Sequence, residues 1–504
     1  MGFPILSIIL FVPLVGAVLA LLIPKGKENW IRGVSVALSM IPLVLSFVAW
    51  IGVTNLGGGE MRYVEEASWI SAFNVWYRLG VDGISAPLIM LTSLLTTLSL
   101  FYSAYTIKVR VREYYFLFQL LQVGMLGVFL SLDLILFYVF WEIGLVPMFL
   151  LIGIWGGERR QYAAIKFFLY TLAGSVLMLL AILGVFFDTG TFSIIEAAEL
   201  QPFANNWTLA VLAFWGFFIG FAIKVPSFPF HTWLPDAHTE APTAGSVILA
   251  GVLLKLGAYG LIRIALPFFP EVFRFYTYSV PVIPILAVIS MVYGALVCMA
   301  QWDLKRLIAY SSVSHMGYVT LGISAAAAGI GRDLLDSAAQ ALNGASMQMF
   351  THGIITGGLF FIVGIIYERA HTRDLKAFGG LGSKVPYYYG ITMVTGFASL
   401  GLPGLAGFWS EFFVFRGTLR IIPFFAFVGG LAIVFTAGYI LWKIVQYVFL
   451  GTFDEARWGK LTDMVWWEKV TMWPLVIVMI GFGIYPAPIL ELFNSATTAL
   501  LGRL

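Results

Sequence analysis

Long apolar runs separated by short polar connectors fill most of the chain. A helix that crosses a bilayer needs about 20 apolar residues, and about fourteen runs approach that length. They are continuous rather than alternating, which favours helices over the strands of a membrane barrel. We therefore expect an all-α polytopic membrane protein. The expected spans are 3–23, 30–52, 84–107, 114–131, 132–154, 162–187, 207–230, 243–266, 276–300, 305–328, 338–366, 387–415, 421–446 and 471–494.

Two of these runs are interrupted. Residues 224–238 hold three prolines and two histidines, and residues 399–411 hold Pro403 among several glycines. A broken helix is tolerated at membrane depth only where its backbone is buried in protein or lines a wet cavity. Paired breaks are typical of inverted-repeat transporters. We expect one membrane domain, 1–504, made of three N-terminal helices (1–112), a first five-helix repeat (113–267), an inverted second repeat (275–450) and a C-terminal helix (470–504).

Composition excludes several other classes of protein. With 60% hydrophobic and 11% charged residues, the chain cannot be an ordinary water-soluble globule. The net charge of +3 is spread over the loops, which argues against a nucleic-acid partner. The single cysteine, Cys298, excludes a disulfide framework, a four-thiolate cluster and a structural zinc site. The five histidines lack metal-ligand spacing. We expect no cofactor in this chain, so any redox centre belongs to a partner.

The basic residues predict the orientation, because Lys and Arg accumulate in cytoplasmic loops. With fourteen spans and an outside N-terminus, the inner loops hold 17 of them and the outer side 8. Both termini are therefore expected outside. The first run has no basic residue before it and no small-residue cleavage site, so we interpret it as a span rather than a removed signal peptide.

Glu142 and Lys224 are the first candidate pair. Glu142 lies about ten residues, or about 15 Å, into its span, and Lys224 stands at the first break. An ionisable group at that depth is by default a functional hypothesis. If the two approach and separate, the carboxylate controls how tightly Lys224 holds a proton. The alternative is a static ion pair that only fixes helix packing.

Lys255 and Glu411 extend this hypothesis. Lys255 lies about twelve residues into its span, too deep to reach the interface easily, and could receive a proton laterally from Lys224. Glu411 follows the second break and could pass the proton outward. For Glu411 the alternative is a neighbour of Arg416 at the membrane rim.

The remaining ionisable residues within the apolar runs are either part of a proton relay or structural. Histidine titrates near neutral pH and suits a relay, but a hydroxyl-bonded neutral imidazole in a packed core fits equally well. Lys166 and Asp133 lie near span ends, where an interfacial anchor is favoured over a place on the path, and Lys443 reads the same way. The candidate relay residues are His315, His352, His231, His238, Lys166 and Asp133.

At residues 140–147, 224–255 and 402–415 the chain resembles the antiporter-like subunits of respiratory complex I. The string Trp233-Leu234-Pro235-Asp236-Ala237-His238 is long and specific. Among these subunits the chain is most similar to the middle one, the M type of bacteria or subunit 4 type of mitochondria. Glu411 stands where the L and N types carry lysine, and the long lateral helix of the L type is lacking.

The resemblance implies a proton-translocating subunit of an NADH:quinone oxidoreductase in the bacterial plasma (inner) membrane. It also implies fourteen helices with two inverted five-helix repeats. FMN, iron–sulfur clusters and quinone would then sit in partner subunits, with L- and N-type subunits on either side, and lipids around the chain. Matched by position, Glu142, Lys224, Lys255 and Glu411 would form the proton path, with His315 and His352 on its axis.

Two alternatives of other classes stay open. Relatives occur in ferredoxin-fed complexes, in membrane-bound hydrogenases and in multisubunit sodium/proton antiporters, which work without redox chemistry. Co-purification with iron–sulfur partners would separate these cases. The third reading is a membrane scaffold whose buried ions are structural, and in that case loss of Lys224 would harm assembly and pumping together.

Overall fold

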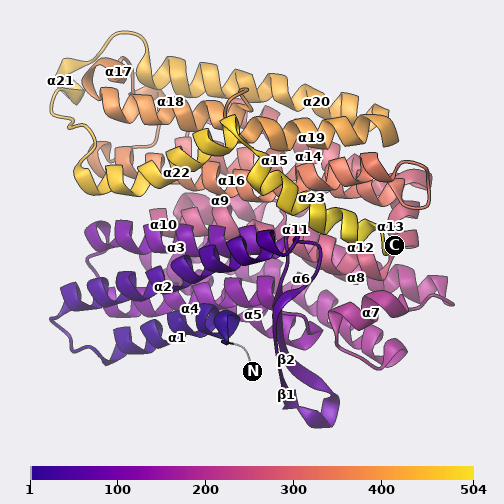
Figure 1. The fold of residues 1–504 in the computed structure, drawn as a ribbon. Coiled ribbons are helices and arrows are strands. Elements are labelled where there is room, and N and C mark those ends of the chain that lie inside the picture. The colour runs from indigo at the N-terminus through magenta and orange to yellow at the C-terminus, as the bar shows by residue number, and fades with distance from the viewer. Residues whose placement is uncertain (1–2) are drawn as a thin grey trace.

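Long helices run side by side along one direction in the computed structural model, which describes residues 3–504 (Figure 1). Within that range, twelve are long and apolar enough to cross a membrane, so the prediction of an all-α polytopic protein is confirmed. They are α1 (Ile5–Leu22), α2 (Glu28–Asn55), α3 (Ser85–Thr106), α4 (Val111–Leu130), α5 (Leu134–Trp155), α6 (Arg160–Thr189), α8 (Trp207–Lys224), α10 to α12 (Thr243–Phe268), α14 (Val282–Ala300), α16 (Leu335–Ala370), α20 with η6 (Pro423–Phe449) and α22 (Trp466–Ile484).

Two further expected spans take other forms. Helix α15 (Leu304–Gly329) is long, but serines and His315 reduce its hydropathy. The expected span 387–415 consists of two shorter helices, α18 (Pro386–Leu400) and α19 (Ala406–Ile421). The count of fourteen spans and their division into inverted repeats stay predictions.

Both breaks lie where the sequence predicts them. Helix α8 ends at Lys224, and the next helix, α9 (Trp233–Glu240), begins after a non-helical stretch over 225–232. Pro226 and Pro229 lack the backbone N–H that a continuing helix needs. Helix α18 ends at Leu400, and Gly401 follows in the left-handed conformation (φ 77°), which closes the helix without a Cβ penalty.

The helix that carries Lys255 is wound irregularly. It consists of α10 (Thr243–Ile248), the π-helical η2 (Leu249–Leu253), α11 (Leu254–Gly260), the π-helical η3 (Leu261–Ala265) and α12 (Leu266–Phe268). A third π-helical stretch, η6 (Tyr439–Phe449), follows α20 (Pro423–Gly438). Wide turns of this kind are rare and concentrate at functional sites.

The C-terminal region differs from expectation. A single span over 471–494 is wrong, because α22 ends at Ile484 and α23 (Ala487–Leu501) starts a new helix. Pro486 is the physical reason, since it cannot donate to the preceding turn and disfavours helical geometry at Tyr485. Helix α23 then packs against α16.

A β-hairpin replaces one of the expected short connectors. Strands β1 (Arg62–Ile70) and β2 (Val75–Val81) pair antiparallel around η1 (Ser71–Phe73) and project from the helices in Figure 1. Glu65 accepts hydrogen bonds from the backbone N–H groups of Leu6 (2.8 Å) and Ser7 (3.0 Å), so it caps α1. Burial raises the pKa of the Tyr77 hydroxyl to about 12, which keeps it protonated.

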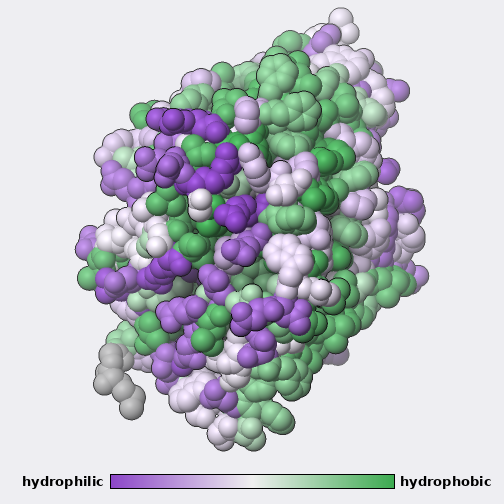
Figure 2. Space-filling view, turned by 90° about the vertical axis from the view of Figure 1, so that its right-hand side faces the viewer, coloured by the Kyte–Doolittle hydropathy of each residue, from purple (hydrophilic) through white to green (hydrophobic). Residues whose placement is uncertain are grey.

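Short helices complete the connectors. They are α7 (Ile194–Leu200), α13 (Pro270–Arg274), η4 (Phe275–Ser279), η5 (Leu375–Ala377), α17 (Leu381–Lys384) and α21 (Glu455–Trp458). Figure 2 looks onto the end of the bundle where α7, α13 and the C-terminus lie. Hydrophilic residues gather on this end, and hydrophobic ones cover the flank beside it, as expected for helices that cross a bilayer endwise.

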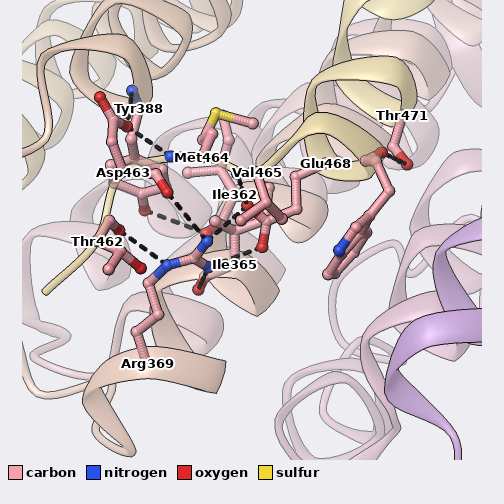
Figure 3. Close-up of polar contacts among 11 residues, drawn as sticks. Ile362, Ile365, Arg369, Tyr388, Thr462, Asp463, Met464, Val465, Glu468 and Thr471 are labelled. Atoms are coloured by element: carbon pink, nitrogen blue, oxygen red, sulfur yellow. Dashed lines mark hydrogen bonds and ion pairs between the residues drawn. The ribbon is translucent and has the colours of Figure 1, made fainter.

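A cluster of polar contacts ties three helices together at one end of the bundle (Figure 3). Arg369, near the end of α16, donates through two guanidinium nitrogens to the two carboxylate oxygens of Glu468 on α22, each at 2.7 Å. Asp463 accepts from the backbone N–H groups of Tyr387 (2.8 Å) and Tyr388 (2.9 Å) and so caps α18. These contacts fix α16, α18 and α22 relative to one another.

Helices α16 and α19 approach closely at Gly344. A Cβ on Gly344 would lie 2.8 Å from the backbone carbon of Phe413 and 2.9 Å from the carbonyl oxygen of Ser410. We expect Gly344→Val to destabilise the subunit by about 1–3 kcal/mol or more, since backbone cannot give way like a flexible side chain. Thermal inactivation of the solubilised complex would measure this. Gly430→Val is the control, because no atom lies within 4 Å of its Cβ position, and equal losses in both variants would contradict the close-contact explanation.

Candidate functional site

Buried ionisable side chains follow one another across the bundle from α5 to α19. Lys255 is 0% exposed and Lys224 1%, and two histidines and a glutamate beside them are also buried. Charged groups are expensive to bury, and in membrane helices they mark ion pathways. The set is Lys224 at the end of α8, Lys255 on α11, His315 on α15, His352 on α16 and Glu411 on α19, together with the half-buried Glu142 on α5.

Lys255 and His352 form the tightest contact of the set. The Lys255 ammonium lies 2.8 Å from Nδ1 of His352, and it also donates to the carbonyl of Ala250 in the π-helical turn before it. An ammonium can only donate, so Nδ1 accepts and a neutral His352 carries its proton on Nε2. That Nε2 is buried and has no hydrogen-bond partner among the described residues. In this pair the Lys255 ammonium can donate a proton to Nδ1 of His352, and Nε2 of the same ring is free to pass a proton on.

His315 joins His352 to Glu411. The two imidazole rings are 5.7 Å apart between centroids, and no hydrogen bond joins them among the described residues. Nδ1 of His315 lies 3.3 Å from Oε1 of Glu411, and its Nε2 lies 3.2 Å from the hydroxyl of Ser399. A cavity of about 10 Å³ is bounded by both histidines and Glu411, near the minimum size for one water molecule.

Glu411 is held directly behind the second break. A Cβ on Gly401 would lie 2.9 Å from Oε2 of Glu411, so only glycine leaves the carboxylate this room. Glu411 is buried and contacts His315, so the alternative of a rim residue beside Arg416 is wrong.

Glu142 and Lys224 do not form an ion pair within the described residues. The Lys224 ammonium instead lies over the rings of Trp141 (5.4 Å) and Phe167 (5.5 Å), in a cation–π arrangement. Since Trp141 directly precedes Glu142, Lys224 contacts α5 one position before Glu142. Neither Lys224 Nζ nor Glu142 Oε1 has a hydrogen-bond partner there. The static ion pair that was the alternative is therefore not what the structure contains.

Lys224 and Lys255 are linked through helix packing rather than by contact. A Cβ on Gly257 would lie 2.9 Å from the Cβ of Lys224 and 3.0 Å from a methyl group of Val225. Gly257 is two residues after Lys255, so the end of α8 packs directly on the segment that carries Lys255. This close approach places the end of α8 against the helix that carries Lys255.

His231 lies in the first break and His238 on α9. His231 stacks on Phe228 at 5.8 Å between ring centroids, and His238 stacks on Phe360 at 4.5 Å. All four of their ring nitrogens are buried without a hydrogen-bond partner among the described residues. Buried polar groups without partners are uncommon and call for an explanation such as an unseen water or a catalytic role.

Lys166 and Asp133 have identifiable structural contacts. The Lys166 ammonium lies 2.7 Å from Oδ2 of Asp236 on α9, so it anchors the second half of the broken helix. Asp133 accepts from the backbone N–H groups of Ile135 and Leu136 and so caps α5. Lys443 lies over the rings of Trp302 and Trp442.

Sequence reasoning did not single out several polar partners. Ser399 contacts His315, and Ser410 hydrogen-bonds Gln348 on α16. Arg263 on η3 forms a buried ion pair with Asp82 at 2.5 Å. The signal available was position, since Ser399 and Ser410 flank the second break, and Arg263 is a cation inside an apolar run. Within residues 3–504, no group of three His, Cys, Asp or Glu side chains is arranged to hold a metal ion.

Comparison with known proteins adds independent findings. A family model described as NADH:quinone oxidoreductase/Mrp antiporter, transmembrane region, matches residues 131–436. The NADH-quinone oxidoreductase subunit M of Rhodobacter capsulatus is 42% identical over 511 residues, covering 99% of this chain and 96% of that protein. A chain of respiratory complex I from Thermus thermophilus is similar in structure, with TM-score 0.86, 29% identity and coverage of 99% and 100%. A chain of the Mrp complex from Dietzia sp., at 21% identity, TM-score 0.86 and coverage of 99% and 98%, shares the fold.

Proposed function

Because this chain belongs to the NADH:quinone oxidoreductase/Mrp antiporter family and is matched end to end by M subunits, it is a membrane subunit of an NADH:quinone oxidoreductase, and we propose that it moves protons through its buried ionisable side chains. The proposed path runs through Glu142, Lys224, Lys255, His352, His315 and Glu411. Other subunits of that complex are its partners.

The observation that carries this proposal is the contact of Lys255 with His352, followed by that of His315 with Glu411. A proton passed from the Lys255 ammonium to Nδ1 of His352 frees a proton on Nε2. That proton can cross to His315 through one water in the small cavity that both histidines line, and then reach Glu411. Each step moves a proton between neighbouring groups, so this chain needs no redox chemistry of its own.

Glu142 and Lys224, at the start of the proposed path, control when a proton moves. Lys224 has no fixed carboxylate partner and contacts α5 at Trp141, the residue before Glu142, so a change in the field around Glu142 would alter how tightly Lys224 holds its proton. Electron transfer elsewhere in the complex would produce that change. Loss of the proton from Lys224 would then favour protonation of Lys255 across the α8–α11 contact.

The assembly follows from the same proposal. FMN, iron–sulfur clusters and quinone sit in partner subunits, and L- and N-type subunits flank this chain, with lipids around it. Helices of residues 113–267 and 275–450 form the two inverted repeats. The membrane is the bacterial plasma membrane, with both termini outside; residues 1 and 2 themselves lie outside the described part of the chain.

The test is proton pumping by the assembled complex in membrane vesicles. We expect Glu142→Gln and Lys224→Ala each to lower pumping and coupled electron transfer together by about 10²-fold, the typical worth of a positioned proton-transfer group. Subunit content should stay unchanged. The exposed residues Glu60 and Lys27 supply the controls Glu60→Gln and Lys27→Ala. Normal pumping by both variants of the path would refute it.

The sodium/proton antiporter alternative is tested in the same preparation. If the complex that contains this chain held no iron–sulfur partners and moved protons only in exchange for sodium, the oxidoreductase assignment would fail. Pumping that requires NADH and quinone but not sodium supports it.

A further inference from the structure

The C-terminal end of α9 is held by donors from both halves of the chain. The carbonyl of Glu240 accepts the backbone N–H of Gly157 at 2.9 Å, which comes from the connector between α5 and α6. The carbonyl of Thr239 accepts from the Arg373 guanidinium at 2.8 Å, and that of Ala241 accepts from the Lys305 ammonium at 2.5 Å. The last carbonyls of a helix lack internal partners and form its negative end, so cations are well suited to bind there.

Lys305 and Arg373 belong to one small structural unit. Arg373 is paired with Asp303 at 3.2 Å, and its carbonyl accepts the backbone N–H of Leu304 at 2.9 Å. Lys305 is the second residue of α15, and Arg373 follows the end of α16 by three residues. We call Lys305, Arg373 and the α9 carbonyls that they bind the α9 clamp. The clamp joins the beginning of α15 to the end of α16 across the tip of α9.

Helix α9 is also held along its length. Asp236 is paired with Lys166 of α6, the carbonyl of His238 accepts from Ser246, and the ring of His238 lies flat on Phe360 of α16. A helix of two turns with partners at every turn moves as one body. A displacement of α9 is therefore transmitted to Lys305 and Arg373, which bind its C-terminal carbonyls.

We propose that Lys305 and Arg373 are positioning residues that couple the first broken helix to the two helices carrying His315 and His352. This inference rests on the proposed proton path. His315 lies ten residues after Lys305 on α15, about 15 Å along the helix axis. His352 lies on α16, whose end leads into Arg373. A shift of α9 when the charge on Lys224 changes thus moves both histidines relative to Lys255 and Glu411.

A polar cavity of about 440 Å³ lies beside the clamp, lined by Glu240, Glu368, Lys305 and Arg373 among others. The cavity leaves room for altered side chains at these two positions, so substitution need not distort the surrounding backbone. Neither residue contacts the proposed proton path itself. Loss of the clamp should therefore change coupling rather than remove a proton-carrying group.

The experiment uses Lys305→Met and Arg373→Gln in the assembled complex and measures protons moved per electron together with electron transfer per complex. We expect fewer protons per electron, with electron transfer per complex largely retained. Arg373→Lys should restore the ratio, because it keeps a cationic donor. The matched control is Lys376→Gln, which removes a cation three residues away that lies over Trp302 and does not contact α9. A merely structural role would lower the amount of complex and leave the ratio per complex unchanged.

Amide hydrogen exchange of residues 237–241 in the whole complex provides a second measurement, which also applies if Lys305→Met fails to assemble. Faster exchange in Arg373→Gln than in Lys376→Gln supports the clamp. An unchanged ratio and unchanged exchange in Arg373→Gln would overturn it. If Glu142→Gln and Lys224→Ala then still abolish pumping, the result contradicts only the proposed clamp and leaves the proton path supported. If those two variants pump normally, the proposed proton path itself is wrong.

Discussion

Lys255→Met is expected to abolish proton pumping while the subunit remains folded in the membrane. The Lys255 ammonium is the donor to Nδ1 of His352, and methionine has similar length but carries no proton. Loss of a positioned proton-transfer group costs about 10²-fold or more in rate. Stability should be kept, because replacing a fully buried charge by a well-packed apolar side chain is often neutral or stabilising. Pumping in vesicles and subunit content measure the two effects separately.

Lys443→Met is the matched control for that variant. Lys443 is buried like Lys255 and lies in the π-helical η6, but its ammonium lies over Trp302 and not on the proposed path. We expect its complex to pump normally. Equal loss of pumping in the two variants would show that buried lysines in this subunit act through packing, and normal pumping by Lys255→Met would remove Lys255 from the path.

Arg369→Ala should have the largest effect on stability. Glu468 is 1% exposed and Arg369 15%, and they share two hydrogen bonds of 2.7 Å (Figure 3). Removing one partner of a buried pair leaves an uncompensated charge and costs about 3–5 kcal/mol. We expect α22 to lose its attachment to α16, with a lower midpoint of thermal inactivation and less subunit in purified complex.

The double variant Arg369→Met/Glu468→Met tests the cause. It removes both charges, so much of the lost stability should return if the unpaired carboxylate is responsible. The Arg62–Glu60 pair, of which Glu60 is exposed and Arg62 half-buried, supplies a control, since Arg62→Ala should cost less than about 1 kcal/mol. A double variant as unstable as Arg369→Ala would instead assign the loss to the contacts of Arg369 with the carbonyls of Thr462 and Asp463.

The spans and both breaks could be predicted because they depend on local chemistry. Apolar length determines which segments cross a bilayer, and clustered prolines and glycines such as Pro226 and Pro229, or Gly401 and Pro403, favour a break in the helix. The hairpin of β1 and β2 was missed because its sequence is short, polar and not strictly alternating. The π-helical turns around Lys255 were missed because apolar sequence does not distinguish them from α-helix.

The candidate residues were predictable, but their pairing was not. Lys255 and His352 are 97 positions apart, and only the packing of α10 and η2 against α16 brings them to 2.8 Å. The sequence offered Glu142 and Lys224 as a switch if the two approach, or as a static ion pair, but it could not show where the ammonium lies, which is over Trp141. Lys166 was expected to be an anchor, but its partner Asp236 was not foreseen because it stands on the far side of the break.

The π-helical turns on either side of α11 decide where this helix can change length. A π-helical turn contains one residue more than an α-helical turn, so deleting a residue within 249–253 can restore regular winding and leave both flanking segments in place. The same deletion in α15 or α16 would rotate all later residues by about 100° and turn a histidine away from its partner. Homologous chains can therefore gain or lose single residues at η2 and η3 without separating Lys255 from His352, whereas α15 and α16 must keep a constant length between their polar side chains.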